Sequence, residues 1–168
     1  LDGAPLCIPE NQGELIPRHP NFRFAATANT NGASDGSGLY QGTLRQNLAF
    51  MDRFVLCEMP YPDPATEEAL LKKTYPALPD VIRKKMVEFA GEVRKLFIGD
   101  DGSAANRIEV TFSTRTLLRW ADLTLRYQPL AAQGIQPIGH ALDRALAWRA
   151  SRESRAVLHE LVQRIFPK

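Results

Sequence analysis

The sequence predicts an α/β segment followed by an all-α domain. In the first third of the chain, short apolar runs alternate with turn-forming residues, as they do in the strands of a sheet. Farther along, apolar residues recur every three or four positions, which is the period of a helix that buries one face. The 168 residues contain no internal repeat. We therefore expect part of an α/β domain over 1–61 and a helical bundle over 62–168.

The first residues predict the end of a helix and then a hairpin. Leu1–Gly3 is typical of a last helical turn with its glycine stop, which indicates a C-terminal fragment of a longer protein. Two apolar stretches, 5–8 and 14–17, then flank the sequence ENQG, whose Asn and Gly favour the positive φ angles of a tight turn. We expect a β-hairpin here.

Two longer apolar runs are expected to be strands of a parallel sheet. The run FRFAATAN, which ends at Asn29, has the composition of a strand buried on both faces, and 54–59 is the second candidate. The loop 32–42 is rich in Gly but lacks the GxxxxGK[ST] spacing of a phosphate-binding loop, so we interpret it as a connector. We expect Cys7 and Cys57 to be small buried side chains rather than disulfide or metal ligands.

The helical part opens with a well-defined helix start. Asp63 can cap the helix, and Pro64 fits its first turn. Glu67 and Glu68 then face the positive end of the helix dipole. A longer helix over 80–97 follows, because apolar residues recur along one of its faces.

Three more helices complete the predicted bundle. Ser113 or Thr114 caps the first of them. The other two are recognised by their apolar faces, which are expected to be buried. These faces consist of Ile138, Ala141, Leu142, Ala145 and Trp148 in one helix, and of Val157, Leu158, Leu161, Val162 and Ile165 in the other.

Composition and charge argue against membrane, nucleic-acid-binding and metal-binding proteins. No apolar run reaches the roughly 20 residues needed to span a bilayer, and the first residues do not have the layout of a signal peptide, so we expect a cytoplasmic protein without a membrane partner. The formal net charge is only +2, and the arginines between 144 and 155 alternate with acidic and apolar residues. Nucleic acid is therefore not an expected partner. The three histidines lack ligand spacing, so no metal site is predicted.

Asn29 is the first candidate for a functional residue. Ligands of open α/β sheets bind beyond the carboxyl ends of the strands, where Asn29 is expected to lie. Its amide can donate to a phosphate oxygen while it accepts from a water, which suits phosphoryl transfer. The alternative is an asparagine that only shapes the following turn.

Arg53 and Arg115 are the two candidate cations. Arg53 directly precedes a predicted strand and is expected to face outward, where it could reach the terminal phosphate bound by a neighbouring subunit or pair with Asp52 or Glu58. Arg115 lies in the first turn of a predicted helix, where its charge opposes the helix dipole by about 0.3–1 kcal/mol. Either a bound phosphate or solvent screening would relieve this cost.

Five segments follow one another in a fixed order: HPNFRFAATANT, GLYQGT, NLAFMDRF, YP and STRTLLRWA. In this order and spacing they resemble successive motifs of the MoxR-class AAA+ ATPases, especially the ATPase subunits of aerobic cobaltochelatases. The resemblance covers nearly the whole chain. The closing helices are similar to those of the same group.

The resemblance implies a fold and a set of roles. The fold is the C-terminal part of a P-loop AAA+ core followed by a helical lid. Asn29 matches the sensor 1 position, Arg53 the arginine finger and Arg115 the sensor 2 arginine. ATP and Mg²⁺ are the implied cofactors, and identical subunits in a hexameric ring are the implied partners. The implied activity is chaperone-like remodelling of a client with a von Willebrand factor A domain, a metal chelatase being one example.

The sequence also departs from this family pattern. It contains neither GxxxxGK[ST] nor an apolar strand that ends in Asp-Glu. The lysine that grips the phosphates and the acids that hold Mg²⁺ are therefore expected in an N-terminal part, and we expect this chain alone not to hydrolyse ATP. The alternative function is a non-catalytic helical module that binds a protein, in which the arginines serve packing or surface pairs.

Overall fold

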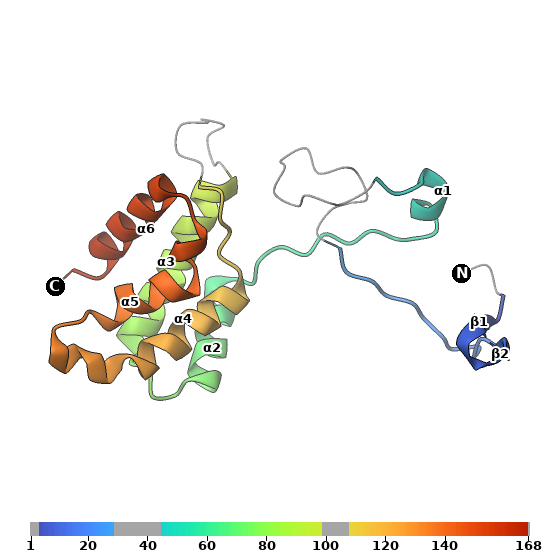
Figure 1. Ribbon diagram of the computed structural model, residues 1–168, viewed down its shortest axis with the longest axis horizontal. Helices are drawn as coiled ribbons and strands as arrows, with labels where there is room; N and C mark the ends of the chain where they lie inside the picture. The colour runs from blue at the N-terminus through green and yellow to red at the C-terminus, as the bar shows by residue number, and fades with distance from the viewer. Residues whose placement is uncertain (1–3, 29–44, 99–107, 168) are drawn as a thin grey trace. The chain divides into compact units, whose positions relative to one another are not determined.

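A computed structural model describes residues 4–28, 45–98 and 108–167 (Figure 1). The chain divides into two compact units, Leu1–Glu58 and Met59–Lys168, and each is described by itself. Asn29, the Gly-rich loop 32–42 and the polar connection 99–107 lie outside the described residues.

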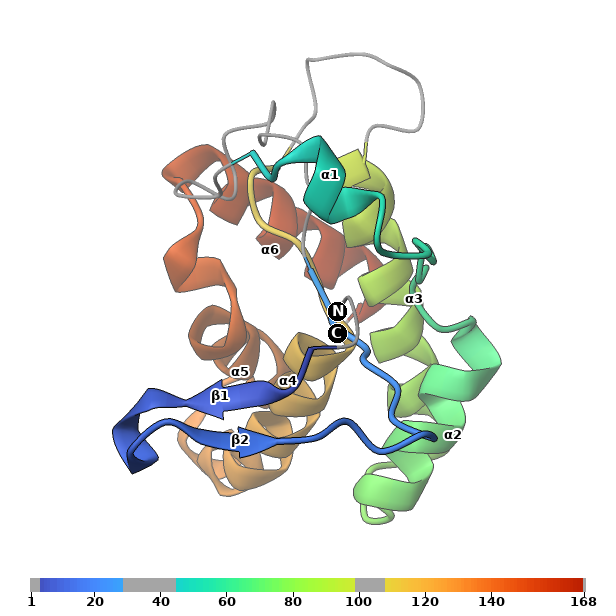
Figure 2. The ribbon, with the colours of Figure 1, turned by 90° about the vertical axis from the view of Figure 1, so that its right-hand side faces the viewer.

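The first unit contains the predicted hairpin. Strands β1 (Leu6–Ile8) and β2 (Glu14–Ile16) pair antiparallel, and Figure 2 shows them side by side. A short 3₁₀ turn, η1 (Pro9–Asn11), connects them and is followed by Gln12 and Gly13 with φ of 54° and 77°. Positive φ is the backbone conformation that a tight turn needs, and glycine adopts it without steric cost. The hairpin prediction is confirmed.

The two predicted buried strands are not present in the described part of the first unit. Residues 21–28 and 54–59 have no strand assignment, and their apolar side chains are exposed, with Val55 at 93%, apart from the half-buried Phe54. A strand buried on both faces needs neighbours that pair its amides and carbonyls. Among the described residues the only sheet is the two-stranded hairpin, so these runs have no such neighbours.

The environment of the two cysteines also differs from expectation. Cys7 and Cys57 are exposed instead of buried. Among the described residues, β1 with Cys7 pairs only with β2, and the run that contains Cys57 forms no strand, so no further layer covers either thiol. The helix that follows the Gly-rich loop is a single turn, α1 (Leu48–Met51), capped by the side chain of Asn47, which accepts from the amide of Ala49 at 2.8 Å.

The second unit is the predicted helical bundle (Figure 1). Its elements are α2 (Pro64–Thr74), α3 (Asp80–Ile98), α4 (Thr114–Arg126), η3 (Gln128–Gln133), α5 (Pro137–Ala145), η4 (Ala147–Arg149) and α6 (Arg152–Ile165). Helix α3 packs against α2, α4 and α6, and α4 packs against α5.

An aromatic cluster forms the centre of this bundle. Phe89 of α3, Phe112 before α4 and Trp120 of α4 are fully buried, with ring centroids 4.8–5.8 Å apart. The indole nitrogen of Trp120 donates to the carbonyl of Ile138 at 2.9 Å, which ties α4 to α5. Phe112 therefore anchors the segment that leads into α4.

Local signals at the helix ends are confirmed. Asp63 accepts from the amide of Thr66 at 2.9 Å, and Ser113 accepts from the amide of Thr116 at 3.1 Å. Two residues of the predicted apolar faces are exposed, Trp148 at 57% and Val157 at 37%. Val157 lies at the edge of its face, since the buried residues of α6 are Ser154, Leu158, Leu161, Val162 and Ile165. For Trp148, the prediction treated 138–148 as one helical face, whereas α5 ends at Ala145 and a 3₁₀ turn follows, so the helical period does not extend to Trp148.

Candidate functional site

The site is built around the first turn of α4, where Arg115 lies. The Ser113 cap fixes this turn, since its hydroxyl accepts from Thr116 and its carbonyl accepts from the amide of Leu117 at 3.0 Å. Arg115 follows one residue after the helix begins and is exposed. In the described part of the chain, its guanidinium has no hydrogen-bond or ion-pair partner. The turn thus presents a cation at the positive end of a helix.

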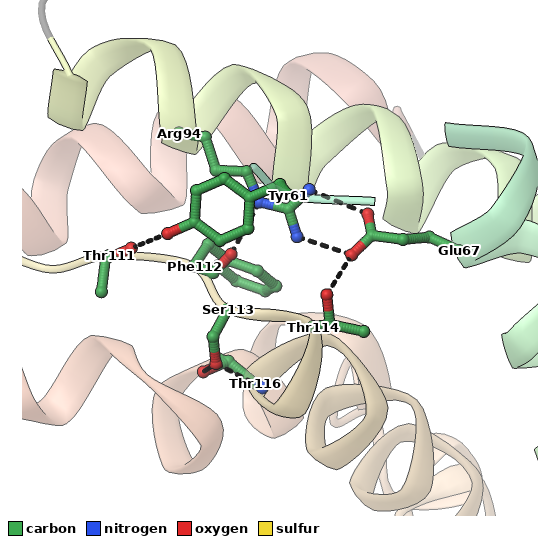
Figure 3. Close-up of polar contacts among 8 residues, drawn as sticks. All are labelled: Tyr61, Glu67, Arg94, Thr111, Phe112, Ser113, Thr114 and Thr116. Atoms are coloured by element: carbon green, nitrogen blue, oxygen red, sulfur yellow. Dashed lines mark hydrogen bonds and ion pairs between the residues drawn. The ribbon is translucent and has the colours of Figure 1, made fainter. Parts of the chain in front are cut away.

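A buried ion pair lies between α3 and the start of α4 (Figure 3). Arg94 of α3 donates to both carboxylate oxygens of Glu67 in α2, at 2.8 Å and 2.7 Å. Glu67 is 1% exposed and Arg94 is 8% exposed. Two parallel bonds between a guanidinium and a carboxylate fix orientation as well as distance, so this pair sets how α2 and α3 lie against each other.

The same pair holds the chain on both sides of Ser113. The Nε of Arg94 donates to the carbonyl of Phe112 at 2.8 Å, and the hydroxyl of Thr114 donates to Oε1 of Glu67 at 2.6 Å. The residue before the cap is thus fixed from α3, and the residue after it from α2. Figure 3 shows these contacts converging on the start of α4.

Tyr61 completes the cluster from the beginning of the helical unit. Its ring packs on the guanidinium of Arg94, with the carbon of the guanidinium 4.2 Å from the ring centroid. Its hydroxyl hydrogen-bonds to Oγ1 of Thr111 at 2.6 Å. Arginine favours such stacking because its planar cation is attracted to an aromatic face. We call Tyr61, Glu67, Arg94, Thr111 and Thr114 the α4 clamp.

Reasoning from the sequence missed the clamp. Glu67 was expected to act only on the helix dipole, but it is buried and paired with Arg94, 27 residues away. The sequence does contain a signal, because Arg94 falls on the apolar face of its helix, between Val93 and Phe97. A charged residue at a core position needs a buried partner of opposite charge.

The other predicted site residues belong to the first unit. Asn29 lies outside the described residues. Arg53 is exposed in the turn after α1, where its guanidinium donates to the carbonyl of Ala49. Arg53 and Arg115 therefore lie in different units, and the roles assigned to Asn29, Arg53 and Arg115 remain predictions.

A second carboxylate caps another helix of the bundle. Glu109 accepts from the amide of Ser151 and from the hydroxyl of Ser154, at the start of α6. Partial desolvation acts to raise the pKa of Glu109, but the bonds from Ser154 and Ser151 together outweigh it and lower the pKa to about 2. Glu109 therefore stays ionised at neutral pH and stabilises the positive end of α6.

Residues 4–28, 45–98 and 108–167 contain neither a metal-binding cluster nor a membrane-spanning helix. Within these ranges, no group of three or more histidine, cysteine, aspartate or glutamate side chains is placed to hold a metal ion. In the same ranges, no helix has the length and apolar character needed to cross a membrane.

Comparison with known proteins identifies the class. Residues 67–165 match the family model described as CbbQ/NirQ/NorQ C-terminal. This match includes Arg115 and every member of the clamp except Tyr61, and it covers more than half of the 168 residues. The chain therefore belongs to the CbbQ/NirQ/NorQ C-terminal family of MoxR-type AAA+ ATPases. The resemblance to this class drawn from sequence motifs is confirmed.

The sequence is also similar to that of one individual protein. Over 117 residues, 67% of this chain, the sequence is 35% identical to the aerobic cobaltochelatase subunit CobS of a Sinorhizobium species. The matched part is 33% of that protein, so the chain spans about a third of the length of this relative.

Proposed function

We propose that the chain is the C-terminal part of an AAA+ ATPase and that its helical unit is the lid over bound Mg-ATP. In this proposal, Arg115 is the sensor 2 arginine and contacts the phosphates of the nucleotide. The observation that carries it is the exposed Arg115 in the first turn of a capped helix, with no counter-ion among the described residues. A phosphate there would interact favourably with both the guanidinium and the helix dipole.

The proposal extends to the rest of the ATPase. Asn29 would orient the attacking water as sensor 1, and Arg53 would reach the nucleotide of the next subunit as an arginine finger. The phosphate-binding lysine and the ligands of Mg²⁺ would lie in a part of the protein outside this chain. The subunits would form a ring, with six as the expected number.

The client is proposed from the family and the relative together. The matched relative is named as a subunit of a cobaltochelatase. By analogy, ATP hydrolysis here would remodel a partner protein, with a von Willebrand factor A domain protein of a metal chelatase as the proposed client. Closure of a lid over nucleotide is a known way to couple binding and hydrolysis to such motion.

The test is ATP binding by the full-length protein with Arg115→Ala. A charge-assisted hydrogen bond contributes about 1.5–3 kcal/mol, so the Kd for ATP should rise roughly tenfold to a hundredfold. Arg126→Ala is the matched control, because Arg126 lies in the last turn of the same helix, where it pairs with Asp122 at 2.7 Å. An unchanged Kd in Arg115→Ala would refute the phosphate contact and favour the non-catalytic binding module.

A further inference from the structure

We propose that Glu67 and Arg94 are positioning residues that aim Arg115 at the nucleotide by holding the start of α4. The inference rests on the proposed function, because it assumes that Arg115 contacts phosphate. It assigns a role in nucleotide binding to two buried side chains that touch no nucleotide themselves.

Helix α4 begins without regular structure directly before it. Residues 108–113 have no helix or strand assignment, so no ladder of backbone bonds aligns the chain as it enters the helix. Burial of Phe112 sets the location of this segment. Its direction is set by the clamp, which bonds the carbonyl of Phe112 and the hydroxyl of Thr114. The backbone on either side of Ser113 is therefore held by two charged groups from other helices.

The geometry of the clamp is specific to the side chains of Glu67 and Arg94. Arg94 uses Nε, Nη1 and Nη2 on three separate acceptors, an arrangement that the single ammonium of lysine cannot reproduce. Oε1 of Glu67 accepts from both Arg94 and Thr114, so one oxygen joins α2, α3 and α4. A shift of this carboxylate moves the start of α4 relative to the other two helices.

The direction of the Arg115 side chain depends on the clamp. Its side chain has no polar contact of its own among the described residues, so its direction follows from the backbone of the turn that carries it. Thr114, which the clamp holds, is the adjacent residue. A displacement of about 1 Å in a group that positions a substrate can change a rate about a hundredfold. Loosening the clamp should therefore weaken the contact between Arg115 and phosphate without removing the arginine.

The experiment is a double-mutant cycle in the full-length protein, with the Kd for ATP as the readout. Glu67→Gln keeps the shape of the side chain but loses its charge, and should raise the Kd about tenfold in the wild-type background. In the Arg115→Ala background it should raise the Kd less than twofold, because the contact that it disturbs is already gone. Asp143→Asn is the control, since Asp143 makes a polar contact with His159 between α5 and α6, and its Kd should match the wild type.

The outcomes separate this inference from the proposed function. If Glu67→Gln and Arg115→Ala each raise the Kd and their effects multiply, Glu67 does not act through Arg115 and the inference is wrong. If Arg115→Ala leaves the Kd unchanged, the proposed phosphate contact itself is wrong. Should Glu67→Gln fail to fold, Thr114→Val takes its place in the cycle, because it removes only the hydroxyl that donates to Glu67. Thr114→Val should then likewise raise the Kd for ATP much less in the Arg115→Ala background than in the wild-type background.

Discussion

Replacing Arg94 with methionine should destabilise the helical unit severely. The change keeps an unbranched apolar chain but removes the guanidinium, with the three donors that bond Glu67 and the carbonyl of Phe112. The carboxylate of Glu67, which is 1% exposed, is left with Thr114 as its remaining donor among these contacts. Removing one partner of a buried ion pair costs about 3–5 kcal/mol, because the other charge stays buried without compensation.

The measurement is thermal and urea unfolding of the chain followed by circular dichroism. In a unit of this size each kcal/mol lowers the Tm by about 4 °C, so Arg94→Met should lower it by roughly 12–20 °C. The free energy of unfolding measured with urea should fall by the same roughly 3–5 kcal/mol. The m-value, which is the slope of that free energy against urea concentration, should change little. A loss of less than about 1 kcal/mol in the free energy of unfolding would refute the buried ion pair, since a solvent-exposed ion pair contributes that much.

A double variant provides the control for this prediction. Glu67→Leu combined with Arg94→Met removes both charges and fills their space with apolar atoms. It should recover most of the stability that Arg94→Met loses, because no uncompensated charge remains. If the double variant is instead no more stable than Arg94→Met, the stability lost in Arg94→Met comes from poorer packing or from the unbonded carbonyl of Phe112. It does not then come from the buried, unpaired carboxylate of Glu67.

Two further predictions concern other parts of the chain. In the full-length protein, Arg53→Ala should abolish ATP turnover while assembly and nucleotide binding are retained, and unchanged turnover would contradict its role as a finger acting on the next subunit. For Glu109, the pKa is lowered from 4.5 to about 2, so its contribution to stability is complete above pH 4.5 and is lost as the pH falls toward 2. The Tm of the wild type should therefore exceed that of Glu109→Gln at pH 7 and converge with it near pH 2, whereas a constant difference would contradict the lowered pKa.

The parts of the fold that the sequence predicted are those with local causes. Asp63 and Ser113 cap their helices through amides three residues away, so the signal and its partner lie in one short window. The hairpin of β1 and β2 was likewise predicted from its turn. Apolar periodicity located α3 and α6 for the same reason.

The predictions that were wrong or missing depend on distant residues. Residues 21–28 have the composition of a buried strand, but pairing requires neighbours that composition does not reveal. The bond between Glu67 and Arg94 joins residues from two helices, and only the position of Arg94 on an apolar face pointed to it. Trp148 was misplaced because a break in helical phase after Ala145 is not visible in the spacing of apolar residues.

The attachment of Tyr61 affects where the helical unit can be cut from the rest of the protein. Tyr61 precedes α2, the first helix of the second unit, yet it packs on Arg94 and bonds Thr111, which is 50 residues farther along the chain. A recombinant fragment that begins at residue 62, where the sequence alone placed the boundary, would contain every helix of the second unit. It would still lack the contacts of Tyr61 with Arg94 and Thr111. A fragment that begins at Met59, where the compact unit starts, keeps them.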